Sequence, residues 1–235
     1  MAINRGGDTP HVIHGVQKDY KQLYYSDPNA ALKVPVTLQS GYGLIEQGTA
    51  MSKNTSAGSV GGKDQLLPYN PTTFTGAEDH PGRAYLVADS GTADAFVYMT
   101  QDDSYKFKVG DDVIINDDTT AVENVGAVTA IDRSTDLHRA KVTFTTNIGG
   151  VAYTAARKAY LAVEAAATSA NNWSDCVGIM EKSVDTGTGV NSQGAVATLI
   201  LGNAVLYSGL LTNFDAAAKT DLSTATTFGQ YVYIR

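Results

Sequence analysis

The sequence predicts a mainly β protein with an α+β core, an extended N-terminal arm and an inserted β-barrel-like module. Three observations predict this architecture. Short apolar strands alternate with glycine turns near both ends of the chain, a run of further short strands lies between them, and the first 35 residues are rich in backbone breakers. A chain of 235 residues can bury the cores of one or two domains.

Residues 1–35 are expected to form an extended arm that lies on a partner. A breaker cluster spans residues 6–10, and Asp27-Pro28 and Val34-Pro35 add two positions that disfavour helix. The arm's apolar and aromatic side chains would supply the contacts: Ile3, Val12, Ile13, Tyr20, Tyr24 and Tyr25. The alternative is an ordinary N-terminal extension packed on its own domain.

Residues 36–75 and 169–235 are expected to form the core. The first segment has strand-like alternation with glycine turns, followed by a loop of Gly, Ser, Thr and Asn over residues 52–64. The second segment has two apolar strands at 177–180 and 198–206, a short Ala-rich helix and an aromatic strand at 228–235. A glycine-rich turn joins the two apolar strands.

Residues 76–168 are expected to form an inserted β module that folds by itself and projects from the core. Short strands with turn residues between them are predicted at 83–87, 96–100, 108–117, 125–131 and 140–145. This succession of short strands is common in small five- or six-stranded barrels. The Ala-rich segment from Ala155 to Ala167 is predicted to be a helix.

Composition narrows the classes of partner. The net charge is −7 and no basic run occurs, which argues against a nucleic-acid partner. No apolar run of about 18 residues is present, so no membrane span is predicted. No signal peptide is visible, and synthesis in a cytoplasm is expected.

A pair of tripeptides is the sharpest enzyme signal. Asp89-Ser90-Gly91 and Asp185-Thr186-Gly187 both fit the pattern of aspartic proteases, in which two carboxylates share a proton. The second copy follows a polar segment rather than the apolar strand that this chemistry needs. The flanks of the two copies also differ, so two ordinary surface turns are the preferred interpretation.

Other candidate sites are weaker, and neither a cofactor nor a metal is expected. The loop at residues 57–64 resembles a phosphate-binding loop but lacks its first glycine. Cys176 has no partner base near it in the sequence, so it is expected to be a small buried residue. His11 and His14 would face opposite sides of an extended arm, and the acidic pairs 102–103, 111–112 and 117–118 do not fit a calcium loop.

Two stretches carry a resemblance to a known family. The first is the strand and glycine turn from Val36 to Met51, followed by Leu66-Leu67-Pro68-Tyr69. The second is the C-terminal unit with Val177-Gly178-Ile179-Met180 and Thr198 to Leu206. In order and spacing they resemble the lambda-type head decoration proteins of tailed phages. The resemblance covers under half of the chain, and the small members of that family lack residues 76–168.

This resemblance implies a structural virion protein without a reaction or a cofactor. It implies a homotrimer on the outer surface of the mature capsid, where it bridges copies of the major capsid protein against the pressure of packaged DNA. The arm would be the capsid-binding element. The alternatives are another phage structural module, such as a tail or fibre-attachment protein, and, more remotely, an aspartic-type protease.

Overall fold

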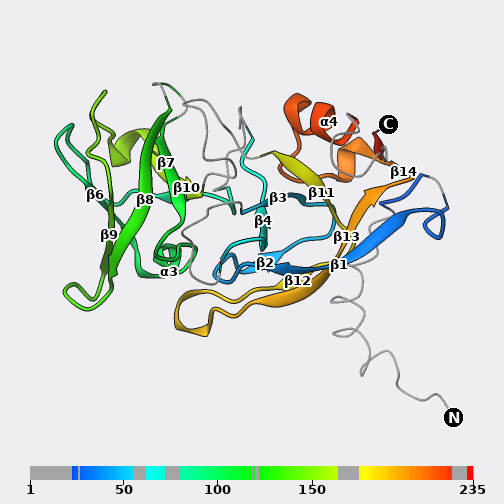
Figure 1. Ribbon diagram of the computed structural model, residues 1–235, viewed down its shortest axis with the longest axis horizontal. Coiled ribbons are helices and arrows are strands. Elements are labelled where there is room, and N and C mark those ends of the chain that lie inside the picture. Colours follow the sequence, from blue (N-terminus) through cyan, green and yellow to red (C-terminus); the bar gives the residue numbers. More distant parts are fainter. Residues whose placement is uncertain are drawn as a thin grey trace, which may run out of the picture.

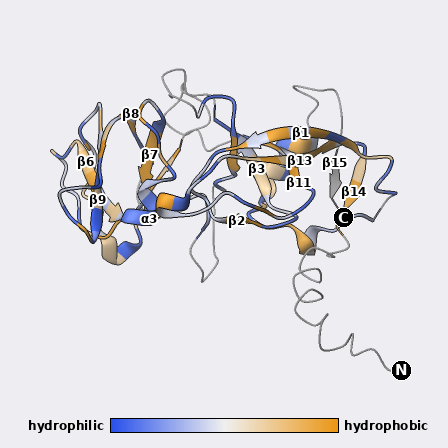
Figure 2. Cartoon of the chain, turned by 90° about the horizontal axis from the view of Figure 1, so that it is seen from below, coloured by the Kyte–Doolittle hydropathy of each residue, from blue (hydrophilic) through white to orange (hydrophobic). Residues whose placement is uncertain are grey.

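The protein is mainly β, as the sequence predicts. The computed structural model describes residues 23–25, 27–54, 62–71, 80–117, 119, 122–163 and 175–223, together with the backbone of 232–234. Two sheet systems lie side by side along the long axis of the molecule (Figures 1 and 2). Within these ranges no helix is both long and apolar enough to cross a membrane.

The first sheet system is a closed five-stranded barrel in the order β1-β13-β11-β3-β4. Its strands are β1 (Leu32–Leu38), β3 (Ala50–Lys53), β4 (Leu66–Pro68), β11 (Cys176–Met180) and β13 (Ala195–Gly202). The longest ladder is the antiparallel pairing of β1 with β13, and a single parallel pairing of Leu38 with Leu66 closes the barrel. Chain segments far apart in the sequence therefore share one core.

Smaller elements flank this barrel. β2 (Leu44–Ile45) pairs with β12 (Val184–Asp185), and β14 (Ala204–Leu206) pairs in parallel with β15 (Val232–Ile234). The short Ala-rich stretch forms the helix α4 (Ala216–Ser223), which confirms the prediction of a brief helix there. Its buried residues, Ala218 and Leu222, pack in an apolar cluster that also contains Ile179 and Ile200 of the barrel. Two single 3₁₀ turns, η2 (Gly189–Asn191) and η3 (Ser208–Leu210), complete this part.

The second sheet system is six-stranded, in the order β5-β10-β7-β8-β9-β6. Its strands are β5 (Ala84–Tyr85), β6 (Phe96–Thr100), β7 (Asp112–Asn116), β8 (Glu123–Asp132), β9 (Arg139–Phe144) and β10 (Tyr160–Val163). The isolated bridge between Leu86 and Met99 brings its two edges together, so the sheet is nearly closed. Alternation sets its faces: Val97 and Met99 point inward, whereas Phe96 and Tyr98 lie on the outer face.

The predicted helix from Ala155 to Ala167 is wrong. Residues Ala155–Arg157 form the single 3₁₀ turn η1, which ends at Lys158 in the left-handed region with φ 55°. Tyr160–Val163 is the strand β10, buried along its whole length between β5 and β7. Burial in the sheet outweighs the helix preference of alanine in this segment. Residues 164–167 lie outside the described ranges.

The described end of the predicted arm is packed on the body. Residues 32–35, which were assigned to the arm, belong to β1 and pair with β13. Ala31 packs against the cluster beside the first barrel, and Leu32 and Val34 pack against the main core. For the described residues up to 35, the structure therefore corresponds to the alternative of an extension packed on its own domain.

The interiors of the two sheet systems belong to one hydrophobic cluster. It includes Leu38, Tyr42 and Met51 of the first part together with Phe107, Val113 and other side chains of the second part. The strands of the six-stranded sheet all lie between residues 84 and 163, yet their core is not isolated from the barrel. A division into a core and a separately folding module stays a prediction.

A buried carboxylate joins the two parts. Asp111, whose side chain is completely buried, accepts hydrogen bonds from Asn54 Nδ2 (2.9 Å), Gln39 Nε2 (3.3 Å) and the Lys108 backbone N–H (2.8 Å). Gln39 follows β1 and Asn54 follows β3, so a residue of the six-stranded part is held by two ends of barrel strands. Because a buried carboxylate must be satisfied by donors, this contact specifies how the two parts meet.

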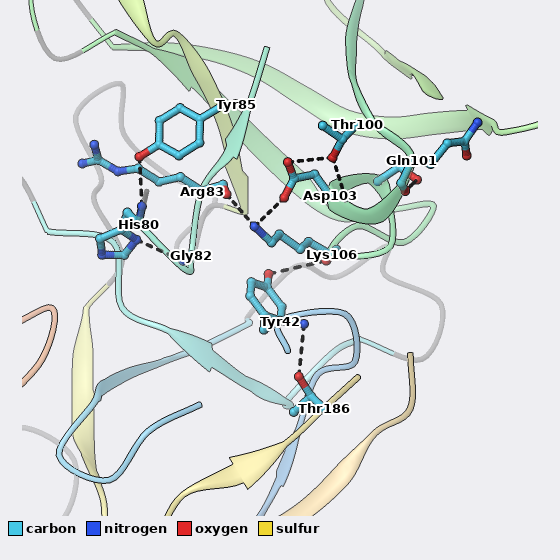
Figure 3. A network of polar contacts seen from close by, with 11 residues as sticks. Tyr42, His80, Gly82, Arg83, Tyr85, Thr100, Gln101, Asp103, Lys106 and Thr186 are labelled. Atoms are coloured by element: carbon cyan, nitrogen blue, oxygen red, sulfur yellow. Dashed lines mark hydrogen bonds and ion pairs between the residues drawn. The ribbon is translucent and has the colours of Figure 1, made fainter. Parts of the chain in front are cut away.

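Lys106 extends the same junction (Figure 3). Its ammonium group donates to the Arg83 carbonyl oxygen (2.6 Å) and pairs with Asp103 (2.7 Å), while its own carbonyl accepts from Tyr42 Oη (3.4 Å). The backbone N–H of Tyr42 in turn donates to Thr186 Oγ1 (3.1 Å). Burial, with Asp111 nearby, raises the pKa of the Tyr42 hydroxyl well above its usual value, so the group stays neutral.

His80 lies near this junction, is 1% exposed and is held neutral. Its Nδ1 accepts a hydrogen bond from the Gly82 backbone N–H (3.0 Å). Burial, and then the positive charges of Arg83 and Lys106, lower its pKa from 6.5 to about 3. Folding therefore favours the neutral imidazole. The contribution of His80 to the free energy of unfolding is fully present above pH 6.5 and is lost as the pH falls from there towards 3.

We expect the free energy of unfolding to fall by about 2–3 kcal/mol between pH 6.5 and about pH 4.5 through His80 alone. The variant His80→Asn keeps an acceptor for the Gly82 N–H but has no titrating ring. Its free energy of unfolding should therefore fall less over this pH interval, by that amount. Urea unfolding at both pH values measures the difference, and His138→Asn, at an exposed position, is the matched control. Equal losses in the wild type and in His80→Asn would contradict the assignment.

Candidate docking site at the root of the N-terminal arm

The two predicted arm residues that the structure describes, Tyr24 and Tyr25, lie where residues 23–25 join the body. Tyr24 forms an antiparallel bridge with Leu206 of β14. The Tyr25 N–H donates to the Val205 carbonyl (2.7 Å), and the Tyr207 N–H donates to the Leu23 carbonyl (3.1 Å). Since β14 pairs with β15 on its other side, residues 23–25 extend that small sheet by one short strand.

Leu23 fixes this short strand by apolar contact. Its side chain is 1% exposed and packs in the cluster that contains Ala50, Cys176, Leu206 and Leu222. Complete burial of a leucine side chain contributes about 1.5–3 kcal/mol. Residues 23–25 are thus attached to the body at one defined place.

A polar group covers the Tyr24 side of the site. The Tyr24 hydroxyl donates to Glu181 Oε1 (3.5 Å), Lys33 forms an ion pair with the same carboxylate, and the Lys33 ammonium lies 5.2 Å from the centre of the Tyr24 ring. Burial, and then the charge of Glu181, raise the pKa of Tyr24 above its usual value. Tyr24 is therefore engaged within its own chain, and its ring does not stand free as a contact for a partner.

Tyr25 has the opposite exposure. Half of its surface, 50%, is accessible, and its ring meets the edge of the Tyr207 ring at a centroid distance of 5.4 Å and an angle of 75°. An exposed tyrosine that packs against a half-buried one, on a sheet edge that the backbone already fixes, is a suitable contact surface, because little conformational entropy remains to be lost on binding. Of the two predicted site residues that the structure describes, Tyr25 is the more exposed, and its role as a partner contact stays a prediction.

The other predicted arm contacts, Ile3, Val12, Ile13 and Tyr20, lie outside the described residues, as do His11 and His14. Sequence reasoning missed Lys33, Glu181 and Tyr207. No local pattern could have found them, because Glu181 is far from Lys33 in the sequence and the two meet only because β1 and β11 both pair with β13.

The two candidate protease tripeptides lie in different parts of the molecule, and each aspartate accepts a backbone N–H group. Asp89 Oδ1 accepts the Ala155 N–H (2.9 Å) and Ser90 bridges to Tyr153, within the six-stranded part. Asp185 lies in β12, and its Oδ1 accepts the Gly187 N–H (2.8 Å). Thr186 is buried and bonds to Gly43 through both its N–H and its hydroxyl. Asp185 is explained by the turn that it stabilises, and Asp89 by the N–H group that it accepts at the start of η1.

Asp89→Asn combined with Asp185→Asn is expected to leave the thermal unfolding midpoint within about 2 °C of the wild type, because an amide Oδ1 can accept the same backbone N–H groups. Calorimetry on the double variant and on the wild type measures this. An acid-protease activity that is present in the wild type and absent in the variant would contradict the structural interpretation.

The remaining chemical candidates have structural explanations where the structure describes them. Cys176 is buried, and its pKa is raised mainly by burial, so the thiol is unreactive. Asp64, from the loop that resembles a phosphate-binding loop, pairs with Lys53 (2.8 Å), and residues 55–61 are not described. Within the described ranges no group of three or more His, Cys, Asp or Glu side chains could hold a metal ion, and Asp118 lies outside them.

Comparison of the chain with models of protein families, with curated proteins and with solved structures found no match.

Proposed function

We propose that this chain is a structural protein of a tailed-phage virion that binds the outer surface of the mature capsid and stabilises it. The observation that carries the proposal is the fixed root of the arm: Leu23 is buried, residues 23–25 pair with β14, and Tyr25 stands exposed beside Tyr207. The resemblance of residues 36–51 and 177–206 to head decoration proteins supports the same class.

The geometry suits a protein that bears load. A sheet edge fixed by Leu23 and by two main-chain hydrogen bonds can transmit force from the arm to the five-stranded barrel. An arm that pairs with a strand of a major capsid protein would gain affinity from main-chain bonds, with apolar side chains adding specificity. Because many copies bind one shell, modest contacts per copy would sum to a large stabilisation of the shell. The proposal includes a homotrimer, which is the assembly that the resemblance to head decoration proteins implies.

The test is binding of the purified chain to expanded heads that lack it. We expect it to sediment with mature heads, to appear as outer-surface density in electron micrographs, and to delay the release of DNA on heating. Light scattering of the free chain reports whether three copies associate in solution. The density on the head surface reports whether three copies associate when bound. Binding to tails in place of heads would favour a tail or fibre-attachment module and overturn the proposal.

A matched pair of variants connects this binding to the candidate site. Tyr25→Ala should weaken head binding at least about tenfold if Tyr25 is a buried contact in the complex. Leu137→Ala removes another exposed side chain, 85% accessible, from the six-stranded part and should change nothing. Equal binding by Tyr25→Ala and the wild type would remove the arm root from the contact surface.

A further inference from the structure

We infer that the outer face of the six-stranded part carries a binding site for a single neutral sugar unit. The site is a hollow of about 160 Å³ lined by Tyr98, Asp132, Thr135, Asp136, Arg139 and Lys141. It lies where β6, β9 and the end of β8 meet the turn that joins β8 to β9. The inference stands on this geometry and does not depend on the proposed function.

The floor of the hollow is an ordered array of aromatic and cationic side chains. Tyr98 pairs across the sheet with Lys141, and Lys141 pairs with Asp132, so the three side chains form one row on the outer face. The Arg139 guanidinium lies 4.2 Å from the centre of the Tyr98 ring, and Lys141 Nζ lies 3.9 Å from the centre of the Phe96 ring. These stacking contacts hold both long side chains in place.

The wall of the hollow is rigid although it is an exposed turn. The Asp132 carboxylate accepts four hydrogen bonds, from the backbone N–H and the hydroxyl of Ser134 and of Thr135. From below, Gln101 Nε2 in the helix α3 (Gln101–Ser104) donates to the carbonyls of Arg133, Asp136 and Arg139. A turn so fastened loses little entropy when a ligand binds, which is the condition for useful affinity in a shallow site.

Polar groups remain for a ligand in the hollow. Arg139 uses only Nε, towards Asp136 (2.8 Å), and neither of its terminal nitrogens donates to another residue of the described part. Lys141 has no ion pair there, and the Tyr98 hydroxyl has no hydrogen bond there. The carboxylates of Asp132 and Asp136 both have lowered pKa values and are charged at neutral pH. Asp132 Oδ2 and both Asp136 oxygens accept one hydrogen bond each in the described part and can accept another from a ligand.

These groups select the class of ligand. Two cations face two carboxylates, so the site has no net charge with which to attract an anion. Donors and acceptors alternate within one hollow, and sugar hydroxyls both donate and accept. The hollow of about 160 Å³ has room for several water molecules and therefore for one six-membered sugar ring.

The test uses the full chain and defined probes. Amide NMR spectra are recorded with the methyl glycosides of glucose, mannose, galactose and N-acetylglucosamine, each up to about 20 mM, since a single sugar in a shallow site should bind with a dissociation constant on the order of 1 mM. We expect at least one glycoside to shift amides within 96–100 and 132–141 and to leave the five-stranded barrel unaffected.

Variants make the assignment specific. Lys141→Gln should weaken the binding of that glycoside at least about tenfold. Tyr98→Phe keeps the ring and the Arg139 contact but removes the hydroxyl, so it should weaken binding less. Lys219→Gln on α4 removes the same charge far from the hollow and should bind like the wild type. Three results would each overturn the inference: no glycoside shifts these amides, Lys141→Gln binds equally well, or inorganic phosphate or N-acetyl-triglycine amide binds the hollow more tightly than every glycoside.

Discussion

Replacing residues 76–168 by a short Gly/Ser link is expected to leave a chain that no longer folds. The segment fits between strands of the barrel in sequence, but its interior and that of the barrel belong to one hydrophobic cluster. The replacement would take the apolar side chains of the second part, such as Phe107 and Val113, out of this shared cluster. At about 1.5–3 kcal/mol for each such side chain, the loss is comparable with the whole stability of an ordinary domain, about 5–15 kcal/mol.

The replacement also removes Asp111 from the donors that surround it. Gln39 and Asn54 would face water or one another without the carboxylate that orders them. The measurement is soluble yield together with a urea unfolding curve of the shortened chain. A cooperative transition close to that of the intact protein would show that the barrel is an independent domain and that the shared core contributes little.

A point variant isolates the polar part of this junction. Asp111→Ala removes one acceptor each from Gln39 Nε2, Asn54 Nδ2 and the Lys108 N–H, while Gln39 Nε2 keeps its bond to the Lys106 carbonyl and Asn54 Nδ2 its bond to Gln39 Oε1. We expect the free energy of unfolding to fall by about 3 kcal/mol. Asp175→Ala, at an exposed position, is the control and should stay within about 0.5 kcal/mol of the wild type. The comparison separates the loss of the buried network from the loss of a negative charge.

The sequence predicted the β class and most strands because alternation and turn residues are local signals. Phe96–Thr100 was predicted with its observed bounds, and the strand near Val125 to Ile131 extends only slightly further, to Glu123–Asp132. The helix predicted from Ala155 failed because burial between β5 and β7, a tertiary effect, determines the conformation of Tyr160–Val163.

The junction and the candidate sites could not be predicted for a similar reason. In the sequence Asp111 is only one member of an acidic pair that does not fit a calcium loop, and it is the fold that brings it to Gln39 and Asn54. Likewise Tyr24 was expected to contact a partner, but the fold places Glu181 and Lys33 against it. What sequence reasoning lacked in both places was the identity of residues that are distant in the chain and adjacent in space.

Two N-terminal truncations should separate binding from folding. Removal of residues 1–22 is expected to leave the thermal transition nearly unchanged, because this segment is rich in breakers and its short apolar runs are too small to form a core. Removal of residues 1–25 also deletes the buried Leu23 and the two main-chain hydrogen bonds of residues 23 and 25. This truncation should lower the free energy of unfolding by about 3–5 kcal/mol, because it leaves an apolar cavity and unpaired backbone groups at β14.

Both truncated chains should bind expanded heads at least about a hundredfold more weakly than the full chain, if the arm supplies strand pairing and buried aromatic contacts. Binding is measured by sedimentation with heads at a series of concentrations. Raising the salt concentration should weaken head binding by the full chain only modestly, since the proposed contact consists mainly of apolar side chains and main-chain hydrogen bonds. The control is Leu23→Ala, which should lower the unfolding midpoint while the folded fraction still saturates heads. Should the chain that begins at Leu23 saturate heads at the same concentration as the full chain, the affinity would have to come from the folded body, and Tyr25 with the neighbouring Tyr207 would be the first contact to test.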